Sequence, residues 1–163
     1  MFAAVPNLNA DPRTFYVELA QQLEGLLAGE RDTIANAANT AALIFNNLAD
    51  LNWAGFYFLR GDTLVLGPFQ GKPACVRIAM GRGVCGSAAA QRKTMRVDDV
   101  NAFADHIACD SASRSELVVP LIRDDAVVGV LDLDSPLAAR FGAIDQTGIE
   151  RMAAIFLAGS DAS

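Results

Sequence analysis

The chain has 163 residues, the length of one domain, and its 52% hydrophobic and 20% charged residues exclude a disordered chain. The formal net charge of -6 at pH 7 disfavours nucleic acid and anionic membranes as partners, because an acidic surface repels phosphate groups. We expect a soluble, cytoplasmic protein, since no apolar stretch reaches the roughly 20 residues of a membrane span and the first residues lack a signal-peptide pattern.

Two helices are predicted in the first third of the chain. Residues 14–27 repeat apolar side chains at helical spacing, and Gly29 is a suitable stop. A second helix is predicted over residues 32–48.

Beyond residue 52 the pattern becomes that of short strands with one inserted helix. The predicted strands cover residues 53–59, 63–66, 75–80, 95–97, 117–122 and 126–133. A short alanine-rich helix reaches about residue 92, an irregular loop covers 100–115, and residues 144–157 form a closing helix. Strands joined by hairpins imply an antiparallel sheet, so the predicted class is α+β with helices on the faces of the sheet.

Three glycines, Gly81, Gly83 and Gly86, match the spacing G-x-G-x-x-G of dinucleotide-binding sites. That fingerprint needs a strand–helix–strand unit with parallel strands. The helix that follows is short and the sheet is predicted to be antiparallel, so we interpret the glycines as a tight turn.

The three cysteines, Cys75, Cys85 and Cys109, are an odd number in a chain expected in the cytosol, which argues against a structural disulfide framework. Buried thiols, a metal site and redox chemistry remain. Cys85 stands where a helix begins, which would favour a thiolate, but a small buried side chain is the favoured interpretation. Cys109 lies in a polar loop, where functional residues concentrate.

His106, the only histidine, lies three residues before Cys109. It could promote thiolate formation there, although a solvated loop residue is the favoured interpretation. One histidine excludes multi-histidine metal sites, and a Cys3His zinc site lacks the usual Cys-x2-Cys pair. We therefore predict no metal.

Carboxylates are the more informative feature. Side chains alternate along residues 126–134, so Asp132 and Asp134 share one face of the strand, on which Val128 and Val130 also lie. If Ile122 pairs with Ala126, Glu116 falls opposite Asp132 and three carboxylates converge. The alternative is a solvated strand end. A converging cluster could bind an ammonium group and keep one acid protonated near neutral pH.

Trp53 and Tyr57 are four residues apart on a predicted strand and therefore share a face. Such aromatic residues either fill the core or form the wall of a pocket for an apolar or cationic ligand.

Together these features resemble the free methionine-(R)-sulfoxide reductases, which are single GAF domains. The resemblance covers residues 52–134, about half of the chain. The matching segments are Trp53-Ala54-Gly55-Phe56-Tyr57, Gly67-Pro68-Phe69-Gln70-Gly71, Ala74-Cys75-Val76-Arg77-Ile78, Gly81-Arg82-Gly83-Val84-Cys85-Gly86, His106-Ile107-Ala108-Cys109-Asp110, Ser115-Glu116 and Asp132-Leu133-Asp134-Ser135.

The resemblance implies one GAF domain over residues 1–163. Its helical segment would cover residues 13–48, its core of about six antiparallel strands residues 52–134, and its closing helix residues 143–158. It also implies an enzyme that reduces free L-methionine (R)-sulfoxide, with no bound cofactor. A cysteine would become a sulfenic acid, a second cysteine would close a disulfide, and thioredoxin would reduce that disulfide. A homodimer is compatible with the resemblance.

Residue roles follow from the matched motifs. The resemblance implies that Cys109 is the nucleophile and Cys75 the resolving cysteine, while Cys85 is an auxiliary resolver or a competing nucleophile. Three acids would bind the amino group and hold the proton donor, and two aromatic residues would enclose the methyl-sulfoxide end. These substrate-binding residues are Glu116, Asp132, Asp134, Trp53 and Tyr57.

Two other functions remain open: a ligand-binding GAF sensory module, and a thiol redox sensor without turnover. The sensor needs the cysteines but not the acids. Replacement of Asp134 by Asn therefore separates the sensor from the enzyme.

Overall fold

The computed structural model describes residues 11–104 and 111–161. The helices are α1 (Pro12–Leu27), α2 (Thr33–Asn47), α3 (Gly83–Gln91) and α4 (Ala143–Gly159), with a 3-10 turn, η1, at Val100–Ala102. The strands are β1 (Trp53–Arg60), β2 (Thr63–Gly71), β3 (Arg77–Ala79), β4 (Met95–Val97), β5 (Ser115–Arg123) and β6 (Ala126–Ser135). They form one antiparallel sheet in the order β3-β2-β1-β6-β5-β4, which confirms the predicted α+β class.

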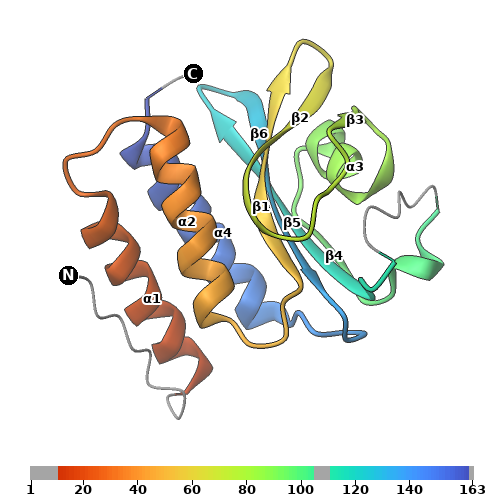
Figure 1. The fold of residues 1–163 in the computed structure, drawn as a ribbon, viewed down its shortest axis with the longest axis horizontal. Helices are drawn as coiled ribbons and strands as arrows, with labels where there is room; N and C mark the ends of the chain where they lie inside the picture. The colour runs from red at the N-terminus through yellow and green to blue at the C-terminus, as the bar shows by residue number, and fades with distance from the viewer. Residues whose placement is uncertain (1–10, 105–110, 162–163) are drawn as a thin grey trace.

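The sheet lies between two unequal layers (Figure 1). Helices α1, α2 and α4 cover one face, where Phe56 and Leu131 are fully buried. Helix α3 covers the other face, where Tyr57 and Val130 are buried. Strand β6 is therefore covered on both faces. None of the helices in the described ranges is long and apolar enough to cross a membrane.

The first two helices begin at aspartate N-caps. Asp11 accepts a hydrogen bond from the backbone N–H of Thr14 at 3.3 Å, and Asp32 accepts one from Ala35 at 2.8 Å. Each carboxylate satisfies an N–H group that has no partner within the helix. Both predicted helices are confirmed to within two residues at each end.

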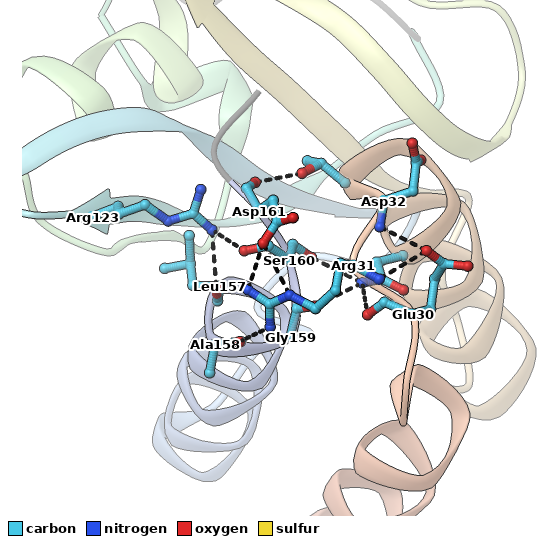
Figure 2. A network of polar contacts seen from close by, with 11 residues as sticks. Glu30, Arg31, Asp32, Arg123, Leu157, Ala158, Gly159, Ser160 and Asp161 are labelled. Atoms are coloured by element: carbon cyan, nitrogen blue, oxygen red, sulfur yellow. Dashed lines mark hydrogen bonds and ion pairs between the residues drawn. The ribbon is translucent and has the colours of Figure 1, made fainter.

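Two arginines fasten the C-terminal end of α4 (Figure 2). Arg31 donates a hydrogen bond to the carbonyl of Ala158 at 2.9 Å. Arg123 donates to the carbonyls of Leu157 at 2.9 Å and Ser160 at 2.8 Å. The last carbonyls of a helix lack partners within it, so these contacts tie α4 to the α1–α2 connection and to β5.

The predicted pairing of the β5–β6 hairpin is wrong. Ile122 pairs with Val127 instead of Ala126, and Glu116 lies opposite Asp134 instead of Asp132. The shift of two residues has two causes. The turn holds two residues, Asp124 and Asp125, so Arg123 pairs with Ala126, and a β-bulge between Leu121 and Ile122 adds one more residue. Such bulges are not visible in the alternation of side chains.

The same bulge moves Val128 to the other face of the sheet. Val128 packs with the core beneath α1, α2 and α4, whereas Val130 packs with the core beneath α3. The sequence prediction had placed these two valines on one face. The extra residue interrupts the alternation at Val128, and the alternation resumes from Gly129 onward.

The strand predicted over residues 75–80 is shorter in the structure, where β3 covers only Arg77–Ala79. The carbonyl of Cys75 accepts a hydrogen bond from the Tyr57 hydroxyl instead of joining the sheet. Residue 75 therefore belongs to the loop before β3.

Candidate functional site

A pocket lies between α3 and the sheet. It is lined by Trp53, Tyr57, Lys72, Pro73, Ala74, Ile78, Arg82, Gly83, Val84, Cys85, Ser113, Glu116, Asp132 and Asp134. Six of these residues were predicted as site residues from the sequence. The structure thus brings the predicted aromatic residues, the three acids and Cys85 to one place.

The sheet positions the three acids. Asp134 lies opposite both Trp53 and Glu116 on the neighbouring strands, and Asp132 lies opposite Gly55. Strand alternation directs all three carboxylates to the face covered by α3. Their predicted convergence is confirmed, although the predicted pairing is not.

Cys85 joins two of the acids in a buried cluster. Its Sγ lies 3.8 Å from Oε1 of Glu116. One donor atom each from Cys85, Glu116 and Asp132 lies within 4.8 Å of the others. All three side chains are buried, with only 4 to 6% of their surfaces exposed.

Burial sets the charge state of this cluster. Loss of solvent raises the pKa of Glu116 well above its usual range, and the charges of Asp132 and Asp134 raise it further. Burial also raises the pKa of Asp132 to about 7. The pair therefore retains a proton near neutral pH, which is the state required of a general acid.

Cys85 is a buried thiol in the first turn of α3. Burial raises its pKa, and the nearby charges of Asp132 and Glu116 act in the same direction. These effects outweigh the partial positive charge of the helix N-terminus. The structure confirms that Cys85 is a small buried side chain, and its raised pKa disfavours the thiolate.

Trp53 and Tyr57 belong to the buried core and also line the pocket, so both interpretations of these residues are correct. Their rings stack with centroids 5.9 Å apart, and Trp53 also stacks on Phe69 at 5.3 Å. The indole Nε1–H donates to the carbonyl of Lys72 at 3.2 Å, and the Tyr57 hydroxyl donates to the carbonyl of Cys75 at 3.0 Å. These hydrogen bonds hold the loop over residues 72–75 against β1.

Of the other two cysteines, only Cys75 lies within the described residues. Cys75 is half-buried and disulfide-bonded. Cys109 lies outside the described residues, as does His106, so their predicted roles are not tested by the structure.

The glycine motif forms a turn, as predicted. Strands β3 and β4, on either side of α3, are at opposite edges of an antiparallel sheet, so there is no parallel strand–helix–strand unit here. The N–H of Gly81 donates to the carbonyl of Gly86 at 2.8 Å. A Cβ on Gly86 would lie 2.3 Å from the carbonyl oxygen of Ala79, so glycine permits close packing of α3 on β3.

Sequence reasoning did not predict a role for the three other polar side chains that line the pocket, those of Lys72, Arg82 and Ser113. Lys72 and Arg82 are exposed residues in turns, and Ser113 is a buried residue just before β5. The glycines around Arg82 drew attention to the turn but not to its side chain. No periodicity identifies a pocket residue in a loop, because its position depends on long-range contacts.

The sequence matches the GAF domain family over residues 11–159. It is 52% identical over 140 residues to the free methionine-R-sulfoxide reductase of Escherichia coli, covering 86% of this chain and 85% of that protein. It is 41% identical to the protein of the same name from Saccharomyces cerevisiae, covering 89% and 85%. The free methionine-R-sulfoxide reductase of Neisseria meningitidis, solved in complex with its substrate, superposes with a TM-score of 0.91 at 44% identity, covering 97% of this chain and 95% of that one. The chain therefore belongs to the GAF domain family and, within it, to the free methionine-R-sulfoxide reductases.

Proposed function

We propose that this chain reduces free L-methionine (R)-sulfoxide to L-methionine. One observation carries the proposal: a buried carboxylate pair, Glu116 and Asp132, lies in a pocket that is also walled by stacked aromatic rings. An amino acid with an apolar, sulfur-containing end complements both parts of this pocket. The names of the relatives give the same substrate.

The acids explain a preference for the free amino acid. The substrate ammonium group would pair with Asp134 and with the ionised member of the Glu116–Asp132 pair. A peptide or acylated nitrogen has no positive charge and fewer donors. Its binding would leave buried acids without partners, which is costly in a closed pocket.

The reaction requires a thiolate and a proton. The thiolate of Cys109 would attack the sulfoxide sulfur while the protonated member of the Glu116–Asp132 pair donates its proton to the oxygen. The sulfur–oxygen bond of the substrate breaks, the oxygen transfers to Cys109 as a sulfenic acid, and methionine leaves.

Regeneration requires a second thiol. Cys75 would condense with the sulfenic acid, which gives a disulfide and releases water. The two thiols of thioredoxin would then reduce this disulfide by exchange and become oxidised themselves. The participation of Cys75 in a disulfide supports this assignment.

Cys85 is proposed to remain a thiol throughout. Its burial and its raised pKa disfavour the thiolate that nucleophilic attack requires. Its contact with Glu116 suits a weak hydrogen-bond donor to the acid pair. This assignment removes Cys85 from the competition for the nucleophile's role.

A single-turnover experiment tests the proposal. Reduced protein is mixed with free L-methionine (R)-sulfoxide, and methionine and remaining thiols are quantified. We expect each chain to form one methionine and lose two thiols. Cys109→Ser should form none, whereas Cys75→Ser should form one and accumulate a sulfenic acid that dimedone traps. Methionine formation by Cys109→Ser but not by Cys85→Ser would overturn the assignment.

A further inference from the structure

We infer that Cys85, Glu116 and Asp132 also form a binding site for a thiophilic divalent cation of the Zn²⁺ class. The three residues come from α3, β5 and β6 and meet at the pocket. Binding of the cation does not depend on the proposed function. The expectation that the bound cation excludes the sulfoxide does rest on that function.

The distances between the donor atoms suit a small tetrahedral ion. Zn²⁺ bonds sulfur at about 2.3 Å and oxygen at about 2.0–2.2 Å, so neighbouring tetrahedral ligands lie roughly 3.3–3.8 Å apart. Sγ of Cys85 and Oε1 of Glu116 are already 3.8 Å apart. The donor atoms of Cys85, Glu116 and Asp132 all lie within 4.8 Å of one another. Small side-chain rotations would therefore complete the geometry.

An orphaned oxygen points to a ligand. Oδ1 of Asp132 is buried and has no hydrogen-bond partner, and the residue is only 5% exposed. Buried carboxylate oxygens without a donor are rare because their desolvation is costly. A cation that accepts this oxygen as a ligand would remove the cost.

The chemistry of the donors selects the class of cation. One sulfur and two carboxylates suit Zn²⁺ or Co²⁺, whereas Mg²⁺ and Ca²⁺ require oxygen ligands alone. Binding releases the thiol proton of Cys85, because only the thiolate is a ligand. Three protein ligands leave the fourth tetrahedral position to water.

Co²⁺ is the probe of choice because its thiolate complexes absorb in the near ultraviolet and its tetrahedral complexes absorb strongly in the visible. It is added to the oxidised protein, in which Cys75 is disulfide-bonded and Cys85 is a free thiol. We expect both absorptions to appear and Zn²⁺ to abolish them. The absence of a thiolate band, or its persistence in Cys85→Ser, would overturn the inference.

Two carboxamide variants provide a matched comparison. Glu116→Gln removes a ligand and should weaken Co²⁺ binding at least about tenfold. Asp134→Asn also replaces a carboxylate of the pocket by an amide, but Asp134 is not a proposed ligand. The loss of Co²⁺ affinity in this variant should therefore be clearly smaller. Circular dichroism verifies that each variant is folded. Equal losses in the two variants would overturn the site, because only general attraction would then remain.

A competition experiment separates this inference from the proposed function. Free L-methionine (R)-sulfoxide is titrated into the Co²⁺ complex, and loss of the thiolate band is followed. Displacement is the expected result. If Co²⁺ binds but the sulfoxide neither displaces it nor is reduced by the metal-free protein, the site stands and the proposed function fails. If the sulfoxide is reduced but no thiolate band forms, the proposed function stands and the cation site fails.

Discussion

The Tyr57 hydroxyl oxygen lies 3.0 Å from the carbonyl oxygen of Cys75 and donates a hydrogen bond to it. Trp53, on the same face of β1, donates to the carbonyl of Lys72 at 3.2 Å. One strand thus holds both ends of the loop over residues 72–75. The backbone of the proposed resolving cysteine is therefore positioned by the same aromatic residues that form the wall of the pocket.

Tyr57→Phe should slow the formation of the disulfide without slowing the release of methionine. The variant keeps the ring but loses the hydrogen bond to Cys75, whose contribution of about 1 kcal/mol corresponds to roughly a fivefold change in rate. Rapid quenching of a single turnover measures both steps. Tyr16→Phe is the matched control, because Tyr16 bonds Asp145 at 2.8 Å in a different part of the fold. Equal slowing in both variants would refute the positioning role.

Asp134→Asn should lose most sulfoxide turnover while keeping the response of its cysteines to oxidants. Asp134 lines the pocket and its charge raises the pKa of Glu116, so its loss weakens both ammonium binding and proton retention. The coupled turnover rate and the disulfide yield with hydrogen peroxide are measured side by side. A normal turnover rate would contradict the role given to the acids. Loss of the disulfide response as well would indicate general damage.

The acid pair should make the free protein less stable as pH rises. The pKa of Asp132 is about 7 in the folded state, above its ordinary value, because the residue is buried. Between pH 4 and 7 the folded state therefore binds more protons than the unfolded state, so the free energy of unfolding falls as pH increases. The loss attributable to Asp132 is on the order of 1–4 kcal/mol and accumulates as pH rises through about 7, the pKa of the folded state.

Urea unfolding of the wild type and Asp132→Asn at pH values from 4 to 8 measures this effect. The variant should gain stability relative to the wild type as pH rises. Asp124→Asn, in the exposed β5–β6 turn, controls for the loss of one negative charge. Parallel curves for the wild type and Asp132→Asn would contradict the account.

Gly86→Ala should lower the free energy of unfolding by about 1–3 kcal/mol, because the new methyl group would collide with backbone and force α3 away from β3. The nearest atom, the carbonyl oxygen of Ala79, lies 2.3 Å from the added Cβ. Gly159→Ala is the matched helical control, where the nearest atom is 3.5 Å away, an ordinary contact. Similar unfolding curves for the two variants would show that α3 packs less tightly than the structure indicates.

The sequence predicted the parts of the fold that depend on local pattern. Asp11 and Asp32 cap helices that the spacing of apolar residues predicted. Strand β4 covers the same residues as the predicted strand. The pairing of β5 with β6 was not predictable, because it depends on a bulge near Ile122. Glu116 nevertheless reached the predicted face, since Asp132 and Asp134 are two residues apart and project to the same side.

The composition of the site was more predictable than its charge state. The motifs identified Cys85, Glu116 and Asp132, but residue spacing does not show how deeply a thiol is buried. Because burial controls the pKa of Cys85, only the folded structure could decide between the thiol and the thiolate. Lys72 and Arg82 were missed for a related reason, since long-range packing brings their turns to the pocket.

The most direct test of the central claim is a substrate comparison with thioredoxin, thioredoxin reductase and NADPH. NADPH consumption is followed on free L-methionine (R)-sulfoxide, its (S) epimer and the N-acetylated (R) form. Consumption on the free (R) epimer alone is predicted, because the buried acids require a free ammonium group. Equal rates on the N-acetylated form, or no consumption on any of the three with intact thiols, would contradict it.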